Sequence, residues 1–342
     1  MRQVYRLLKL NSLLRGHRAK FAGVFLAHTF GFRHLAIRFD PVMACNLRCT
    51  MCAFSNEDYV RGLKGRFTAE EIERLAASFF SRALLVVFGC GTEPTVYKNF
   101  PELVRIAKRH RVPNVSMTTN AQLIKAEHIE QLIDYGLDEL TISVHGTTRE
   151  TYEKFMVGAS FDKLHEVLGL LEEAKARRGV RSPMLRINYT VNSENLDELD
   201  MFFHIFGRYT IGTLQVRPVM DIRGQYRTPL DAAELPRYNK IIAALGEKCR
   251  ERGIIYLANT VDPTYEAPND GSVVLQAVHR YIGPMDVWQR DFDWRNETYM
   301  QYCRRIGWGR YLLRCAMSDL DKVRTRNAEL WGKYAVKYEV NF

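Results

Sequence analysis

Between about residues 34 and 220, the chain alternates six times between a short apolar segment and a segment with helical periodicity. The apolar segments are rich in β-branched and aromatic residues and are mostly apolar on both faces, which is typical of buried parallel strands. The alternation predicts an α/β fold, and six units fit a partial (β/α)6 TIM-like barrel better than a complete eight-unit one. The predicted strands are His34–Asp40, Ala83–Gly89, Asn114–Thr118, Glu139–Val144, Leu185–Val191 and Thr213–Val219.

The two ends of the chain have a different pattern from the barrel. Residues 1–33 place basic side chains among leucines and phenylalanines, and the first acidic residue of the chain is Asp40. We expect a basic amphipathic helical segment here, which either flanks the barrel or rests on an anionic membrane. The alternation weakens after about residue 225, so we expect the barrel core to span residues 34–225 and a mixed substrate-side extension to span residues 226–342.

The net charge of +10 is concentrated at the two ends. Residues 1–39 contain eight basic and no acidic residues, and the chain from Cys303 onward contains nine basic and four acidic residues. A nucleic-acid-binding protein would be more uniformly basic, so no specific nucleic-acid binding is expected. No apolar run approaches the roughly 20 residues that span a bilayer. We therefore expect a cytoplasmic protein, with peripheral membrane contact through residues 1–33 as the open alternative.

Three of the seven cysteines, Cys45, Cys49 and Cys52, lie directly after the first predicted strand with the spacing C-x3-C-x2-C. Three thiolates on one short loop can bind three irons of a [4Fe–4S] cluster, and the open position at the fourth iron is typical of a catalytic metal centre. A structural zinc site requires a fourth ligand nearby, and the next cysteine or histidine is Cys90. The alternative is a non-catalytic protein that binds zinc or an iron–sulfur cluster on the same fold.

The cysteine spacing, the apolar Met51 and the position after the first strand resemble the radical SAM superfamily over about residues 34–220. The resemblance implies one [4Fe–4S] cluster on the three cysteines, S-adenosylmethionine (SAM) on its open iron, and an external one-electron reductant of the flavodoxin or ferredoxin type. Reductive cleavage of SAM would then yield a 5′-deoxyadenosyl radical that modifies a peptide, a sugar or a lipid-linked intermediate. The barrel resembles the subgroup of the molybdenum-cofactor cyclases and SPASM enzymes, although no recognisable SPASM cysteine set is present.

Further motifs follow strand ends, as this resemblance requires. The run Gly89-Cys-Gly-Thr-Glu-Pro94 resembles the family's Gly-Gly-Glu-Pro motif, which contacts the methionyl ammonium of SAM. Relatives often carry Arg where this chain has Met156. Arg186 is the first candidate replacement because a guanidinium pairs well with a carboxylate, and Lys154 is the second. The expected SAM contacts are Gly91, Thr92, Glu93, Ser143, Arg186, Asn188 and Met220.

Two motifs are expected near SAM or substrate at the barrel mouth. The segment Thr118-Thr119-Asn120 resembles the family's Thr-Asn-Gly step, with Ala121 in place of Gly, so Thr119 and Asn120 are expected to face the mouth. His145 stands where many relatives carry Asp. It is either a proton donor or substrate contact, since histidine titrates near neutral pH, or a hydrogen-bonded structural residue.

The C-terminal third leaves two questions open. Cys249, Cys303 and Cys315 include no C-x2-C pair, so they are either buried free thiols or ligands of an auxiliary cluster. Residues 281–314 are rich in Trp, Tyr and Arg, which either grip an anionic or cyclic substrate or form a basic face over an aromatic core.

Overall fold

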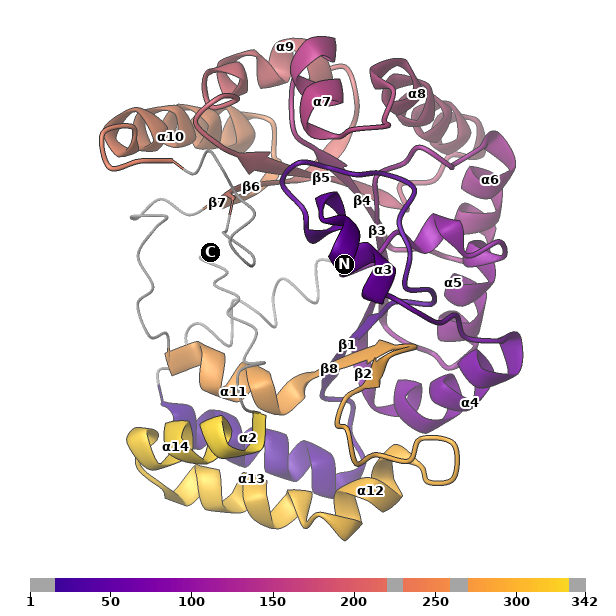
Figure 1. Ribbon diagram of the computed structural model, residues 1–342, viewed down its shortest axis with the longest axis vertical. Coiled ribbons are helices and arrows are strands. Elements are labelled where there is room, and N and C mark those ends of the chain that lie inside the picture. The colour runs from indigo at the N-terminus through magenta and orange to yellow at the C-terminus, as the bar shows by residue number, and fades with distance from the viewer. Residues whose placement is uncertain (1–15, 220–229, 259–269, 332–342) are drawn as a thin grey trace.

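A single curved sheet forms the centre of the molecule, and helices lie along its outer side (Figure 1). The computed structural model describes residues 16–219, 230–258 and 270–331, with side chains except those of 270–272 and 326–331. In these ranges the sheet has nine strands in the order β7-β6-β5-β4-β3-β2-β1-β8-β9. Their bounds are β1 Leu35–Phe39, β2 Ala83–Phe88, β3 Asn114–Thr119, β4 Glu139–Val144, β5 Met184–Val191, β6 Ile211–Pro218, β7 Ile255–Ala258, β8 His279–Gly283 and β9 Asp286–Val287.

The six strands predicted from the sequence correspond to β1–β6, and their observed ends differ from the predicted ones by at most two residues. Neighbouring strands from β1 to β7 pair in parallel, as their apolar pattern predicted. The α/β fold with a partial TIM-like barrel is therefore confirmed. The carboxyl ends of these strands share one edge of the sheet, which is where such barrels carry their chemistry.

The crossover helices follow the sequence signals that predicted them, and α4 is the clearest example. The Thr68 hydroxyl accepts a hydrogen bond from the Glu71 amide at 3.2 Å, and the Glu71 carboxylate accepts one from the Thr68 amide at 3.0 Å. The side chains of Ile72, Leu75 and Phe79 then recur at helical spacing and are buried. The helices between β1 and β7 are α3 Glu57–Gly62, α4 Ala69–Phe79, α5 Phe100–Arg109, α6 Ala126–Asp134, α7 Arg149–Phe155, α8 Phe161–Arg178, α9 Phe202–Phe206 and α10 Leu235–Glu251.

The C-terminal part of the chain adds strands to both edges of the sheet. β7 pairs in parallel with β6, β8 pairs in parallel with β1, and β9 forms an antiparallel pair with β8. The expected boundary near residue 225 therefore falls within one sheet. The division into segments 1–33, 34–225 and 226–342 stays a prediction.

The described part of the N-terminal segment is α2, His17–Phe30, which packs against helices from the C-terminal part. A ring nitrogen of His17 lies 2.9 Å from the Ser318 carbonyl oxygen, and Arg18 forms a 2.8 Å ion pair with Asp319. This arrangement agrees with a helix that flanks the barrel, whereas residues 1–15 of the predicted amphipathic segment lie outside the described residues. The C-terminal helices are α11 Asp270–Val278, α12 Tyr299–Arg305, α13 Trp308–Met317 and α14 Leu320–Trp331.

The aromatic stretch forms a core around a buried arginine. Arg280 is 1% exposed, and its guanidinium carbon lies 4.0 Å from the ring centre of Trp288 and 5.0 Å from that of Trp308. Its nitrogens donate to the His279 carbonyl oxygen at 2.7 Å and to the Tyr299 hydroxyl at 3.2 Å. These contacts support the second expectation for this stretch, an aromatic core.

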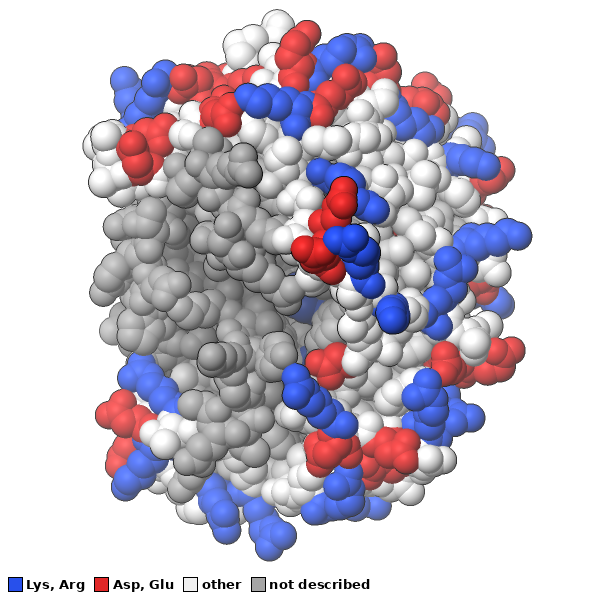
Figure 2. Space-filling model, in the orientation of Figure 1, with Lys and Arg blue, Asp and Glu red and all other residues white. Residues whose placement is uncertain are grey.

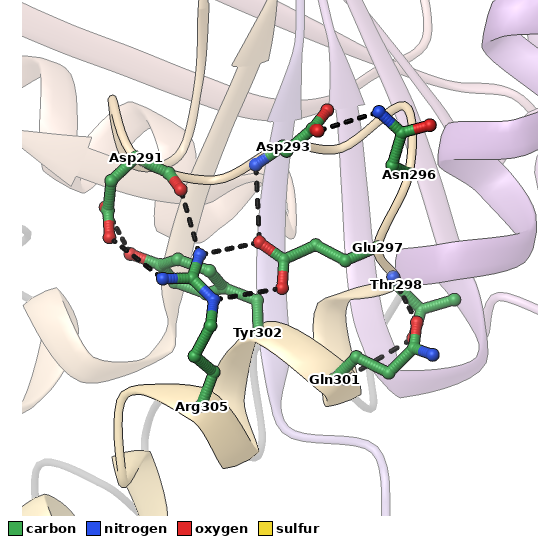
Figure 3. Close-up of polar contacts among 8 residues, drawn as sticks. All are labelled: Asp291, Asp293, Asn296, Glu297, Thr298, Gln301, Tyr302 and Arg305. Carbon is green, nitrogen blue, oxygen red and sulfur yellow. Dashed lines mark hydrogen bonds and ion pairs between the residues drawn. The ribbon is translucent and has the colours of Figure 1, made fainter.

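The exposed side of this core carries its own network of polar contacts (Figure 3). Arg305 donates to the Glu297 carboxylate at 2.7 Å and to the Asp291 carbonyl oxygen at 2.9 Å. The Tyr302 hydroxyl donates to the Asp291 carboxylate at 2.7 Å. The Arg305 guanidinium is therefore already hydrogen-bonded within the C-terminal extension, which argues against a role for Arg305 in substrate binding.

No helix in the described residues is long and apolar enough to cross a membrane.

The two arginines predict different effects on stability. Arg280→Ala removes a buried cation with its hydrogen bonds and ring contacts, and should lower the free energy of unfolding by about 3 kcal/mol. Arg305→Ala removes an exposed, solvent-screened ion pair and should cause a much smaller change. Urea denaturation followed by circular dichroism measures both. Equal losses for the two variants would contradict a structural role for Arg280.

Candidate functional site

The three cysteines of the triplet lie on a loop that follows the carboxyl end of β1. The loop is closed by a 3.0 Å hydrogen bond from the Cys52 amide to the Cys49 carbonyl oxygen. It is anchored to the end of α7, because the Arg48 amide donates to Val157 at 3.0 Å and the Thr50 amide donates to Phe155 at 2.9 Å. The backbone therefore holds the thiols at the edge of the sheet where the other polar motifs end.

Burial disfavours ionisation of these thiols. It raises the pKa of Cys45 to about 11, and it also raises the pKa of Cys52. The pKa of Cys49 is raised by burial and then by the neighbouring Cys52 and Cys45. Three such thiols become thiolates when a cationic group lies among them, so their chemistry fits a metal cluster.

The triplet supplies three thiols from one loop, and each thiolate of a [4Fe–4S] centre binds a different iron. In the described residues, no three His, Cys, Asp or Glu side chains are placed to bind one metal ion.

A buried aspartate shapes the turn that carries the expected SAM contacts. Asp40 follows β1 and is fully buried, and its carboxylate accepts hydrogen bonds from the Cys90 amide at 2.7 Å and the Gly91 amide at 3.0 Å. The Tyr281 hydroxyl of β8 donates to the same carboxylate at 2.9 Å. At Gly89 the φ angle is +79°, and a Cβ there would overlap the Thr118 carbonyl oxygen. The turn thus depends on Asp40 and on a glycine.

Glu93, in the same turn, links the ends of β2 and β3. One carboxylate oxygen accepts hydrogen bonds from the hydroxyls of Thr95 at 2.6 Å and Thr119 at 2.7 Å, and the other accepts one from the Asn120 amide at 2.8 Å. Burial raises the pKa of Glu93, and the hydrogen bonds from Thr95, Thr119 and Asn120 oppose that shift. The structure therefore brings together three of the predicted site residues.

The same network reaches the cysteine loop by two contacts. The Glu93 amide donates to the Ala44 carbonyl oxygen at 3.0 Å, next to Cys45. The Asn120 side-chain amide donates to the Asn46 side chain at 2.9 Å. The loop after β1 and the turns after β2 and β3 consequently form one hydrogen-bonded unit.

A second group of predicted residues lies on β4, β5 and β6. Ser143 and Asn188 are register partners on β4 and β5, and Asn188 is in turn the partner of Gln215 on β6. The Arg186 guanidinium donates to Asn188 at 3.0 Å, contacts the Gln215 side chain, and forms a 3.6 Å ion pair with Glu139. The sequence predicted the neighbourhood of Ser143, Arg186 and Asn188, but it missed Glu139 and Gln215.

The remaining predicted residues have different outcomes. Thr92 is half-buried in the turn between Gly91 and Glu93, and Met220 lies outside the described residues. The Nδ1 atom of His145 lies 2.9 Å from the Val144 carbonyl oxygen, and burial lowers the pKa of His145 to about 4. His145 is therefore neutral near pH 7, which favours a hydrogen-bonded imidazole over a cationic proton donor.

The three C-terminal cysteines are buried and do not meet at one place. Cys249 lies on α10, whereas Cys303 and Cys315 lie on α12 and α13. α10 and the α12–α13 pair lie at opposite ends of the molecule in Figure 1. The arrangement does not support one auxiliary cluster bound by all three.

Residues 41–204 match the family model described as the Radical SAM superfamily. Two curated relatives are named Probable GTP 3′,8-cyclase. The relative from Saccharolobus solfataricus is 26% identical over 205 residues, which cover 59% of this chain and 63% of the relative. The relative from Sulfolobus acidocaldarius is 26% identical over 253 residues, which cover 73% of this chain and 74% of the relative.

Two solved structures have a fold similar to that of this chain. Streptococcus suis SuiB bound to the precursor peptide SuiA has a TM-score of 0.59 at 19% identity and covers 77% of this chain. The structure of anSMEcpe with bound AdoMet and the Cp18Cys peptide has a TM-score of 0.52 at 19% identity and covers 65% of this chain. This chain spans 61% and 62% of those two proteins.

The parallel barrel and the cysteine loop at its edge agree with the family match, which covers residues 41–204, just under half of the chain. Over those residues the chain is similar to the radical SAM superfamily.

The hydrogen bond from Tyr281 to Asp40 is expected to stabilise the turn at Cys90 and Gly91. In Tyr281→Phe the Asp40 carboxylate loses one donor, so the Cys90 and Gly91 amides should exchange with solvent several-fold faster by hydrogen–deuterium exchange. Tyr256→Phe is the matched control, since the Tyr256 hydroxyl donates to a carbonyl oxygen of α10, away from the turn. Unchanged exchange at Cys90 and Gly91 would contradict the role given to Tyr281.

In the turn after β3, we expect that glycine at position 121 would stabilise the protein. Ala121 has a φ of +65°, in the left-handed region that disfavours residues with a Cβ. Ala121→Gly should therefore raise the free energy of unfolding by about 1 kcal/mol. Ala77→Gly, at an exposed helical position in α4, should lower it by about 1 kcal/mol. A loss of stability in both variants would show that Ala121 is not strained.

Proposed function

We propose that Cys45, Cys49 and Cys52 hold the [4Fe–4S] cluster and that SAM binds next to it, over the turn from Gly91 to Glu93. When bound and reduced, the cluster would supply the electron for cleavage of SAM to methionine and a 5′-deoxyadenosyl radical. The observation that carries the proposal is the hydrogen-bonded unit formed by Ala44–Glu93, Asn46–Asn120 and Glu93–Asn120. It fixes the thiol loop and the two turns relative to one another, as a cofactor bound between them requires.

Each predicted residue has a task in this proposal. Glu93 keeps the turn in place and presents negative charge to the methionyl ammonium. Ser143 and Asn188 lie side by side on β4 and β5, where they can bond the ribose hydroxyls. Arg186 is the candidate partner of the SAM carboxylate, and Glu139 and Gln215 orient its guanidinium.

The residues nearest the barrel mouth have tasks in binding rather than in proton transfer. Thr119 and Asn120 hold the second turn through Glu93. His145 takes part as a neutral imidazole, because burial lowers its pKa to about 4. That Met220 lies near the adenine of SAM stays a prediction.

The substrate that we propose is polar and is a peptide, a sugar or a lipid-linked intermediate. The polar side chains of Glu139, Ser143, Arg186, Asn188 and Gln215 on one face of three neighbouring strands support a polar ligand. Relatives named Probable GTP 3′,8-cyclase and a solved structure of SuiB bound to its precursor peptide SuiA support a polar substrate.

Two partners complete the proposal. An external flavodoxin- or ferredoxin-like protein supplies the electron, and residues 1–33 contact an anionic membrane. The face in Figure 2 shows Lys and Arg interspersed with Asp and Glu along its upper and right margins.

The direct test measures SAM cleavage and iron on the same anaerobic sample. After reconstitution and reduction with dithionite, the protein should release 5′-deoxyadenosine from SAM and contain about four irons per chain. Cys45→Ala, Cys49→Ala and Cys52→Ala should each lose both. Cys249→Ala is the matched control, because Cys249 is a buried thiol on α10, and it should keep both.

Three outcomes separate this proposal from its alternatives. Iron retained in all three triplet variants would place the cluster elsewhere. A full cluster without SAM cleavage, in the presence of candidate substrates, would favour the non-catalytic iron–sulfur alternative. Zinc in place of iron would contradict the proposal.

A further inference from the structure

Exposed apolar side chains gather at one end of the molecule. Eleven large apolar side chains are exposed in the described residues, and six of them lie in the two short segments 16–33 and 304–318. Phe30 and Phe32 are the most exposed aromatic residues among the eleven, at 68% and 65%. Exposed apolar side chains mark an interaction site where they form one patch. The six are Leu26, Phe30, Phe32, Ile306, Leu313 and Met317.

The two segments are neighbours in space although they come from opposite ends of the chain. α2 and α13 pack side by side (Figure 1) and run antiparallel. His17 contacts the Ser318 carbonyl oxygen at one end of the pair, and a Cβ on Gly309 would lie 4.0 Å from the His28 ring at the other. Four of the six exposed side chains lie on these two helices, whereas Phe32 follows α2 and Ile306 precedes α13. We call the two segments together the α2–α13 surface (residues 16–33 and 304–318).

α2 exposes apolar side chains in its C-terminal half. Phe21 and His28 are buried, whereas Leu26 and Phe30 are exposed together with Thr29. The exposed charge of α2, Arg18, lies near its N-terminal end and pairs with Asp319. An ordinary surface helix carries charged side chains on its outer face, so the uncharged C-terminal half of α2 is a candidate docking surface.

α13 adds positive charge to the same surface. Arg310, Leu313, Arg314 and Met317 are exposed and follow the i, i+3, i+4, i+7 spacing of one helix face. Neither segment of the α2–α13 surface contains an aspartate or glutamate. In the described residues, no carboxylate pairs with Arg310 or Arg314.

We propose that the α2–α13 surface docks on an anionic lipid bilayer. The arginines of α13 would pair with headgroup phosphates, and Leu26, Phe30 and Phe32 would enter the interface between headgroups and acyl chains. A second copy of this chain would bring Arg310 and Arg314 against the same two arginines, so it fits less well. The inference extends the contact proposed for residues 1–33, because α13 from the C-terminal part supplies half of the surface.

Vesicle co-sedimentation of the full-length protein tests the proposal. The protein should bind vesicles of phosphatidylglycerol and phosphatidylcholine more tightly than vesicles of phosphatidylcholine alone, and salt should weaken the binding. The variant Leu26→Ser/Phe30→Ser/Phe32→Ser and the variant Arg310→Glu/Arg314→Glu should each lower the partition coefficient about tenfold or more.

Matched variants control for apolar and charged surface in general. Leu123→Ser/Val180→Ser/Met201→Ser removes three exposed apolar side chains elsewhere, and Arg181→Glu/Lys248→Glu reverses two exposed charges elsewhere. Both should bind vesicles like the unaltered protein. Circular dichroism and SAM cleavage should be unchanged in all four variants, so failure of this proposal is distinguishable from failure of the proposed enzyme function.

Two results would overturn the proposal. One is vesicle binding that is equal in the α2–α13 variants and their controls. The other is a dimer in size-exclusion chromatography with light scattering that the same α2–α13 substitutions dissociate, because the surface would then be a contact between copies.

Discussion

The buried carboxylates of Asp40 and Glu93 are the interaction on which the site depends. Each sits at the carboxyl edge of the parallel sheet and accepts hydrogen bonds from backbone amides of a neighbouring turn. A buried carboxylate is costly unless it is hydrogen-bonded, so each one is stable only in the conformation that brings its donors together. The two residues thereby convert the ends of β1, β2 and β3 into a rigid frame beside the cysteine loop.

This frame also explains why the C-terminal part of the chain belongs to the site. β8 extends the sheet on the far side of β1, and its Tyr281 supplies a donor to Asp40. The C-terminal extension is therefore part of the site, because the pairing of β8 with β1 places Tyr281 beside the turn expected to bind SAM. On the outer side of the same strand, Arg280 and its aromatic neighbours hold the helices α12 and α13 in place.

The sequence predicted the parts of this structure that depend on local patterns. Periodicity predicts the strands β1–β6, and periodicity together with the capping residues predicts α4. The spacing of the cysteines identifies the triplet. The ion pair of Arg186 with Glu139 and its contact with Gln215 depend on the register between β4, β5 and β6, which no local pattern reveals. Tyr281 lies 241 residues from Asp40, and only the pairing of β8 with β1 brings them together.

The proposed function depends on three cysteines leaving one iron of the cluster open for SAM. The most direct measurement is electron–nuclear double resonance on the dithionite-reduced protein with SAM labelled with ¹⁵N at its amino group. We expect hyperfine coupling between the label and the cluster, which disappears when unlabelled SAM is used. A reduced cluster with bound SAM but without any coupling to the label would contradict the proposed open iron.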